Sequence, residues 1–303
     1  MTEHVANHPA LAPLACVVTV LAWASAFPLI THGLAVLDPL PLAACRFFVA
    51  GVVVGLWLVW AKPKRPTVPD LARFALCGLI GIGVYNALLN IGQQTVSAGA
   101  SSFIINTAPV MTAVLATLFL GERFARWAWV GTLISLGGIA VIAMGQPGGL
   151  TLGGGASLIL GSAGCAAIYF TIQRPMVARY GFLACAAYTL LSGGIFLLPW
   201  LPAGVSSLAA DAWSISIVMA IVHLGVISAA LGYATWTYVL GTYGAARAAN
   251  LLYTVPPTAV LLSILLLGHR PDVLTLLGGA IALFGVVVVQ RAQARATIRS
   301  AQN

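Results

Sequence analysis

Apolar stretches of about 20 residues follow one another along nearly the whole chain, separated by short polar or charged segments. A helix of about 20 apolar residues crosses a bilayer, whereas barrel strands alternate apolar and polar positions over about ten residues. The pattern therefore predicts an all-α membrane protein with ten transmembrane helices. The predicted spans are residues 11–36, 39–60, 72–95, 98–120, 127–145, 154–174, 182–201, 213–240, 245–267 and 274–290.

The sequence also repeats itself at an offset of 147 residues. Each copy holds five predicted spans, an odd number, so the second copy must enter the membrane from the opposite face. We expect two inverted five-helix repeats around a central cavity, residues 1–147 and 148–303, the second ending in a short cytoplasmic tail. The aligned pairs are Thr107 with Thr254, Pro109 with Pro256, Gly121 with Gly268, Arg123 with Arg270, Gly131 with Gly278 and Gly138 with Gly285.

The segments between the predicted spans fix the expected topology. The glycine-rich stretch Gly145 to Gly155 is predicted to link the two halves, and the proline-containing stretch Ala61 to Arg73 to be a non-helical cytoplasmic loop. Twelve of the 14 Lys and Arg residues lie in segments on the side of the N-terminus, and only Arg270 lies on the other side. Because basic loops stay cytoplasmic, both termini are predicted to be cytoplasmic.

Composition narrows the possible partners. With 60% hydrophobic and 7% charged residues and a mean hydropathy of +1.01, the chain needs lipid as part of its solvent. The net charge of +8 belongs to short loops rather than to one helical face, so no nucleic-acid partner is expected. The five cysteines form no close pair and the five histidines no cluster, so we expect no metal, no cofactor and no enzymatic activity. The oligomeric state stays open, and a monomer is compatible with the sequence.

Polar and aromatic residues inside the spans are the candidate site. An unpaired polar group in hydrocarbon costs several kcal/mol, so such residues are expected to face the bundle interior. Amides, hydroxyls and rings without a carboxylate suit a neutral or zwitterionic solute with an apolar body. For each residue the alternative is a helix-to-helix hydrogen bond or simple packing. The predicted substrate-binding cavity comprises Trp23, Phe27, Tyr85, Asn86, Asn90, Gln93, Ser102, Asn106, Tyr169, Gln173, Tyr233, Trp236, Asn250 and Tyr253.

Four further residues have two open interpretations each. Pro109 and Pro256 lie at matching positions inside their spans, where each could be a hinge or a static bend that shapes the cavity. Arg46 could hold a substrate carboxylate, or its stem could reach the external interface. His223 could relay a proton for coupling, or form a structural hydrogen bond.

Several motifs carry a resemblance to a known family. They are WASAF at residues 23–27, LAACRF at 42–47, AGASS at 98–102, NTAPV with LGER at 106–110 and 120–123, and YTVPP with LGHR at 253–257 and 267–270. The chain resembles the EamA-type drug/metabolite transporter (DMT) superfamily over its whole length, and within it is most similar to YddG-type amino-acid exporters. The second copy departs from the pattern, since His269 stands where the first has Glu122.

The resemblance implies a secondary transporter of the bacterial inner membrane that exports neutral or aromatic amino acids, or related small metabolites, by alternating access. The direction of transport rests on the resemblance alone. A multidrug or quaternary-cation efflux carrier is the alternative within the same class, because aromatic rings also attract organic cations. A membrane-embedded enzyme is the alternative of another class.

Overall fold

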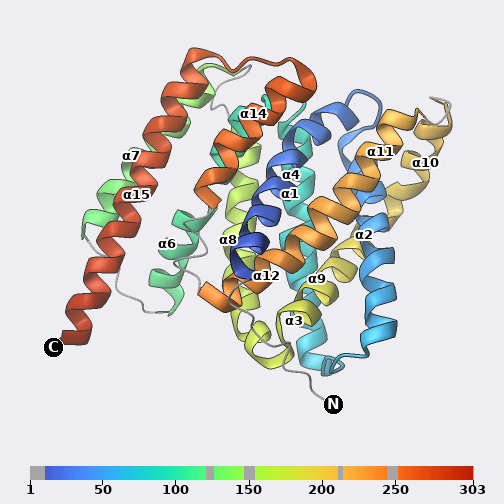
Figure 1. Ribbon diagram of the computed structural model, residues 1–303, viewed down its shortest axis with the longest axis horizontal. Coiled ribbons are helices and arrows are strands. Elements are labelled where there is room, and N and C mark those ends of the chain that lie inside the picture. The colour runs from blue at the N-terminus through green and yellow to red at the C-terminus, as the bar shows by residue number, and fades with distance from the viewer. Residues whose placement is uncertain (1–10, 121–125, 147–153, 211–213, 244–251, 303) are drawn as a thin grey trace.

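The computed structural model describes residues 11–120, 126–146, 154–210, 214–243 and 252–302, and all the regular structure within them is helical. Six helices or continuous helical runs are long and apolar enough to cross a membrane. The helices pack side by side in one layered bundle (Figure 1). In chain order they are α1 (Ala12–Gly33), α2 (Pro39–Ala61), α3 (Val68–Gly78), η2 (Leu79–Val84), α4 (Tyr85–Gly92), α5 (Ala98–Ile105), α6 (Ala108–Leu120), α7 (Arg126–Met144), α8 (Gly155–Tyr180), α9 (Phe182–Leu197), η3 (Leu198–Trp200), α10 (Leu201–Ala210), α11 (Ile215–His223), η4 (Leu224–Leu231), α12 (Gly232–Tyr243), η5 (Leu252–Thr254), α14 (Val255–Leu267) and α15 (Val273–Gln302).

Several of the described helical runs extend beyond the spans predicted from the sequence. Helix α3 begins at Val68, inside the stretch expected to be non-helical, because Pro69 falls in the first turn, where its missing N–H has no intrahelical partner to lose. Helix α15 continues to Gln302, so the residues predicted to form a cytoplasmic tail extend the last helix. The run that starts at Phe182 also continues through η3 to Ala210.

The third span of each half contains a π-helix at the same place. The run Val68–Gly92 contains η2, and the run Ile215–Val239 contains η4. The two runs begin 147 residues apart, and η2 shifted by this offset falls on residues 226–231, inside η4. A π-helical turn holds one residue more than an α-helical turn and widens the helix locally. The two halves therefore share this irregularity.

The fourth span of the first half is broken, because helix α5 ends at Ile105 and α6 begins at Ala108. In the second half the 3₁₀ turn η5 runs directly into α14, and residues 244–251 lie outside the described residues. Pro109 and Pro256 are the second residues of α6 and α14. Pro109 therefore lies in the first turn after a break rather than inside a continuous helix, and its missing N–H costs no intrahelical hydrogen bond there.

Helices α7 and α15, the last helix of each half, pack against each other along their length (Figure 1). A Cβ atom built on Gly131 would lie 2.6 Å from the carbonyl oxygen of Gly285, and one on Gly138 would lie 2.6 Å from that of Gly278. Residue numbers rise along one helix as they fall along the other, so these equivalent helices run antiparallel. Glycine permits this approach because it has no Cβ atom.

A buried carboxylate links α3 to α8 at the end of the bundle where we predict the cytoplasm. Asp70 is fully buried and accepts hydrogen bonds from Thr67 Oγ1 (3.0 Å), Arg73 Nη1 (3.0 Å), Arg179 Nη1 (2.6 Å) and Tyr180 OH (2.7 Å). The Tyr180 hydroxyl also accepts from the backbone N–H of Thr67 at 3.1 Å. The start of α3 is therefore tied to the end of α8.

A second polar cluster joins α7, α15 and the start of α5 at the opposite end. Gln146 Nε2 donates to Asp272 Oδ2 and to Thr275 Oγ1, both at 3.1 Å, and its Oε1 accepts from the backbone N–H of Ser97 at 3.0 Å. Asp272 Oδ1 accepts from the backbone N–H of Thr275 at 2.7 Å and so satisfies a free donor at the start of α15.

Candidate functional site: a central aromatic cavity

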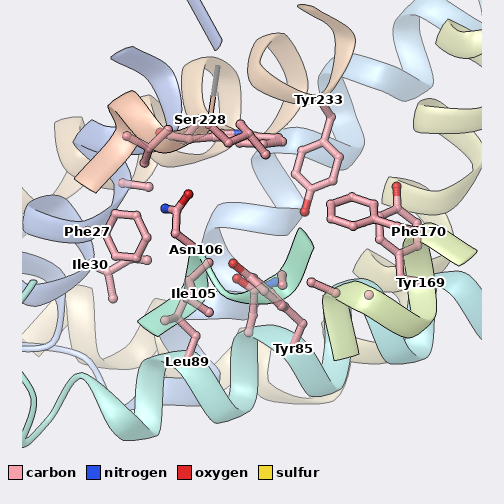
Figure 2. Close-up of a pocket in the computed structure, with 18 of the residues that line it drawn as sticks. Phe27, Ile30, Tyr85, Leu89, Ile105, Asn106, Tyr169, Phe170, Ser228 and Tyr233 are labelled. Atoms are coloured by element: carbon pink, nitrogen blue, oxygen red, sulfur yellow. The ribbon is translucent and has the colours of Figure 1, made fainter. Parts of the chain in front are cut away.

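A cavity of about 110 Å³ lies in the middle of the bundle. Its walls come from α1, α2, η2, α4, α5, α6 with the break before it, α8, η4, α12, η5 and α14. Figure 2 shows Tyr233, Phe170 and Tyr169 at one end, Phe27 and Ile30 at the other, and Asn106 between them. The cavity is thus small, mostly apolar with six aromatic side chains in its wall, and lined by both halves of the chain.

Nine of the sequence-predicted residues line this cavity. The group contains five of the predicted rings, two amides, one hinge candidate and the arginine predicted to lie inside the second span. The nine residues are Trp23, Phe27, Arg46, Tyr85, Asn86, Asn106, Pro109, Tyr169 and Tyr233.

Aromatic rings form a connected wall. The Trp23 ring lies 5.7 Å from that of Tyr233 and 5.4 Å from that of Trp236, and the Phe170 ring lies 6.4 Å from Trp236 and 5.3 Å from Tyr169, centroid to centroid. Such tilted and edge-on contacts add about 0.5–1.5 kcal/mol per pair beyond area burial. Trp236 stands behind Trp23 and Phe170 and holds them in place rather than lining the cavity.

The lining is built from equivalent positions of the two halves. Five pairs of lining residues are related by the offset of 147: Trp23 with Phe170, Gly81 with Ser228, Asn86 with Tyr233, Ile105 with Leu252, and Ala108 with Val255. The residue types within a pair differ, so the wall is symmetric in shape and asymmetric in chemistry.

Three residues of the cavity wall carry buried polar atoms that have no hydrogen-bond partner within the described residues. Arg46 is 5% exposed, and its Nε and Nη1 atoms have no hydrogen-bond partner within the described residues. Its guanidinium carbon lies 4.9 Å from the centroid of the Phe47 ring. Asn86 Oδ1 and Ser228 Oγ are likewise buried and unpaired in the part of the chain that the structure describes. The structure thus leaves donors and an acceptor unused beside one cavity.

Four predicted cavity residues instead make bonds between or within helices. Asn90 Nδ2 donates to the carbonyl oxygen of Pro39 at 2.9 Å, and Gln93 Nε2 to that of Phe27 at 3.3 Å. Ser102 Oγ donates within α5 at 2.6 Å, and Gln173 Nε2 to Thr189 Oγ1 at 3.5 Å. None of the four lines the cavity: three of the side chains bond a neighbouring helix, and Ser102 bonds its own. Asn250 lies outside the described residues, as does the side chain of Tyr253.

His223 is half-buried and lies away from the cavity. Its Nε2 is 2.9 Å from Ser25 Oγ, a contact that joins α11 to α1. Ser25 also donates to the carbonyl oxygen of Ala22 at 3.1 Å. The geometry matches the structural hydrogen bond rather than a group facing a transported solute.

We expect His223→Gln to keep transport and its response to a proton gradient, because an amide can still bond Ser25. His223→Ala loses one hydrogen bond, about 1 kcal/mol of stability. Uptake by liposomes with and without an imposed proton gradient checks this for both variants. If the response to the proton gradient vanished in His223→Gln, the result would support a proton-relay role for His223.

The sequence analysis missed Phe170, Ser228 and Leu252, all of which line the cavity. Each is offset by 147 from another lining residue, so extending the repeat to the first and sixth spans would have indicated Phe170 from Trp23. Ser228 and Leu252 correspond to Gly81 and Ile105, which the sequence analysis did not predict either.

Comparison with known proteins identifies the family, which is one of membrane transporters and not of enzymes. The EamA-like transporter family matches residues 10–144 and again 153–291. The chain belongs to this family, and the double match indicates an internal repeat.

Relatives and a solved structure agree with this assignment. The chain is 37% identical to a probable terminal-alkyne amino-acid exporter of Streptantibioticus cattleyicolor, over 91% of this chain and 92% of the other. It is 37% identical to the uncharacterized transporter YdfC of Bacillus subtilis, over 87% and 86%. Against the uncharacterized inner membrane transporter YedA of Escherichia coli K12 the values are 27%, 89% and 87%. A crystal structure with 19% identity superimposes with a TM-score of 0.62, over 95% of this chain and 99% of the other, which supports the fold.

Proposed function

We propose that the protein is a secondary transporter of the bacterial inner membrane that exports neutral or aromatic amino acids, or closely related metabolites. The observation that carries the proposal is the cavity itself. Rings and amides line it, and none of the described residues in its wall is a carboxylate or a lysine. Such a wall holds an apolar side chain by contact and a polar head group by hydrogen bonds.

Alternating access between inverted halves is the proposed mechanism. The antiparallel pairing of α7 with its equivalent α15, together with lining residues at equivalent positions, supports two oppositely oriented halves around a shared site. The loop charges support cytoplasmic termini. We infer that the break before Pro109 lets the end of α6 move relative to α5, and that Pro256, its equivalent in the first turn of α14, serves the same role in the second half.

Export of amino acids is supported by the 37% identity to a probable terminal-alkyne amino-acid exporter and by the resemblance to YddG-type exporters. The alternative, efflux of organic cations, gains support from the aromatic wall. Arg46 argues against it, because a buried guanidinium without a counter-charge among the described residues repels a second cation.

The test is counterflow in liposomes that contain the full chain, with labelled neutral, aromatic, acidic and basic amino acids and an organic dication. We expect saturable exchange of neutral or aromatic amino acids and none of the dication. Exchange of the dication alone would favour the cation carrier, and flux without saturation or counterflow would indicate a channel. Absence of any amino-acid exchange would refute the proposed substrate class.

A further inference from the structure

Burial of the Arg46 side chain costs free energy that the described part of the bundle does not offset. A guanidinium stays protonated, and burying a charge without a partner costs several kcal/mol even after relaxation. The side chain is 5% exposed, contacts the face of the Phe47 ring, and has no acidic partner within the described residues. A buried cation that the fold leaves uncompensated beside a cavity points to an anionic ligand.

Ser228 lies next to Arg46 across a close helix contact. Gly225, one turn before Ser228 in η4, packs so tightly on α2 that a Cβ atom there would lie 2.7 Å from the carbonyl oxygen of Arg46. Both Arg46 and Ser228 line the cavity, and the Ser228 hydroxyl is unpaired within the described part of the chain. A hydroxyl can add a donor to an anion that a guanidinium already holds.

Asn86 supplies the opposite polarity. Its Nδ2 donates to the carbonyl oxygen of Ile82 at 2.7 Å, which leaves Oδ1 buried without a donor in the described structure. Helix α4 is held against the start of α2 by the bond from Asn90 to Pro39. Asn86 lies one turn before Asn90 and Arg46 two turns after Pro39, so both lie deeper in the bundle, where they line the same cavity.

We propose that Arg46, Asn86 and Ser228 form the head-group site for an α-amino acid. Arg46 and Ser228 donate to the α-carboxylate, and Asn86 Oδ1 accepts from the α-ammonium. The aromatic wall takes the side chain. This inference rests on the proposed function and deepens it, since it requires both head-group charges and excludes organic cations and simple carboxylates as good substrates.

The repeat explains why the head group binds in one orientation. The position equivalent to Arg46 is Gly193, that of Asn86 is Tyr233, and that of Ser228 is Gly81. None of these offers the same polar group, so a cavity with symmetric shape has a single head-group site. The amino acid keeps one set of head-group contacts while the halves exchange access.

The experiment measures ligand-induced shifts of the unfolding temperature of the purified full chain, which report affinity. L-Phenylalanine and L-leucine are compared with their amides, which lack the carboxylate, and with 3-phenylpropanoate and 4-methylpentanoate, which lack the ammonium. In the wild type each missing charge is expected to weaken binding by about 10- to 100-fold, the range of charged hydrogen bonds. An amide that binds as well as its parent amino acid would overturn the role of Arg46.

Variants then assign each charge. Arg46→Met is expected to bind the amides more tightly than the wild type does, a gain that misfolding cannot produce. Asn86→Leu is expected to lose the preference for the amino acid over the deaminated acid. Unchanged selectivity in either variant contradicts the role assigned to that residue. If the wild type bound the deaminated acids as tightly as the parent amino acids, the site would be a simple anion site and the role of Asn86 would be refuted.

A pair of serines provides the matched control. Ser228→Ala is expected to weaken amino-acid binding, whereas Ser101→Ala is not, since Ser101 is also buried and unpaired within the described residues but does not line the cavity. Equal effects would overturn the role of Ser228. If no amino acid exchanges or binds in the wild type, the proposed function itself fails, and this inference with it; failure of the inference alone appears only in the analogues and variants.

Discussion

In a Gly138→Leu variant we expect the protein to unfold well below the unfolding temperature of the wild type. A Cβ atom at Gly138 would lie 2.4 Å from the backbone nitrogen of Ala282 and 2.6 Å from the carbonyl oxygen of Gly278. Backbone atoms cannot rotate away as the end of a side chain can, so α7 and α15 would have to separate. Overpacking of this kind costs about 3 kcal/mol or more at the upper end of its usual range.

The neighbouring residue is a matched control. Gly137 lies on the same helix, is exposed, and a Cβ atom there meets nothing within 4 Å. Gly137→Leu is expected to keep or slightly raise stability, because leucine favours helix over glycine by up to about 1 kcal/mol. Thermal unfolding in detergent, followed by tryptophan fluorescence, compares the two. Equal unfolding temperatures of the two variants would contradict the close α7–α15 contact.

Asp70→Ala is expected to be the most damaging change of an ionisable residue in the described chain. The carboxylate is fully buried and accepts four hydrogen bonds, two of them from arginines. Its removal leaves the Tyr180 hydroxyl and Arg179 without this acceptor and unties the start of α3 from the end of α8. We expect a large drop in unfolding temperature together with reduced transport in liposomes.

Arg73→Ala separates the buried carboxylate from an ordinary surface pair. Arg73 is 53% exposed and sits three residues from Asp70 on the same helix. Exposed ion pairs contribute little to stability, so we expect the unfolding temperature of Arg73→Ala to drop several times less than that of Asp70→Ala. A drop as large as that of Asp70→Ala would mean that the Arg73 pair, and not the link to α8, carries the stability of this cluster.

The sequence predicted the helical class, the approximate spans and much of the cavity wall for one reason: lipid makes hydrophobic length and buried polarity unusually informative. Trp23, Tyr85 and Asn106 were predicted to line the cavity because polar and aromatic side chains in a span are expected to face the bundle interior rather than lipid. The offset of 147 added the internal repeat, which the double family match supports.

The parts that the sequence could not predict depend on contacts between distant helices. Asn90 and Gln173 have the same residue types as cavity amides, yet each bonds a neighbouring helix, and no local pattern distinguishes the two outcomes. A single serine in an apolar span gives no signal in the sequence, and only the packing of η4 against α2 places Ser228 in the cavity wall. The last span was predicted to end at residue 290, where charges end the apolar run, but charge does not stop a helix, and α15 continues to Gln302.

The π-helices η2 and η4 bear on how the chain arose. A residue inserted into only one half would shift the spacing between equivalent positions by one from that point onward. The spacing is 147 before the π-helix, where α3 begins at Val68 and α11 at Ile215, and 147 after it, where Thr107 aligns with Thr254 and Gly121 with Gly268. This is the spacing that duplication of a five-helix segment already containing the extra residue would give. Such a duplication places the wide turn beside the cavity in the single unit, before the halves were joined.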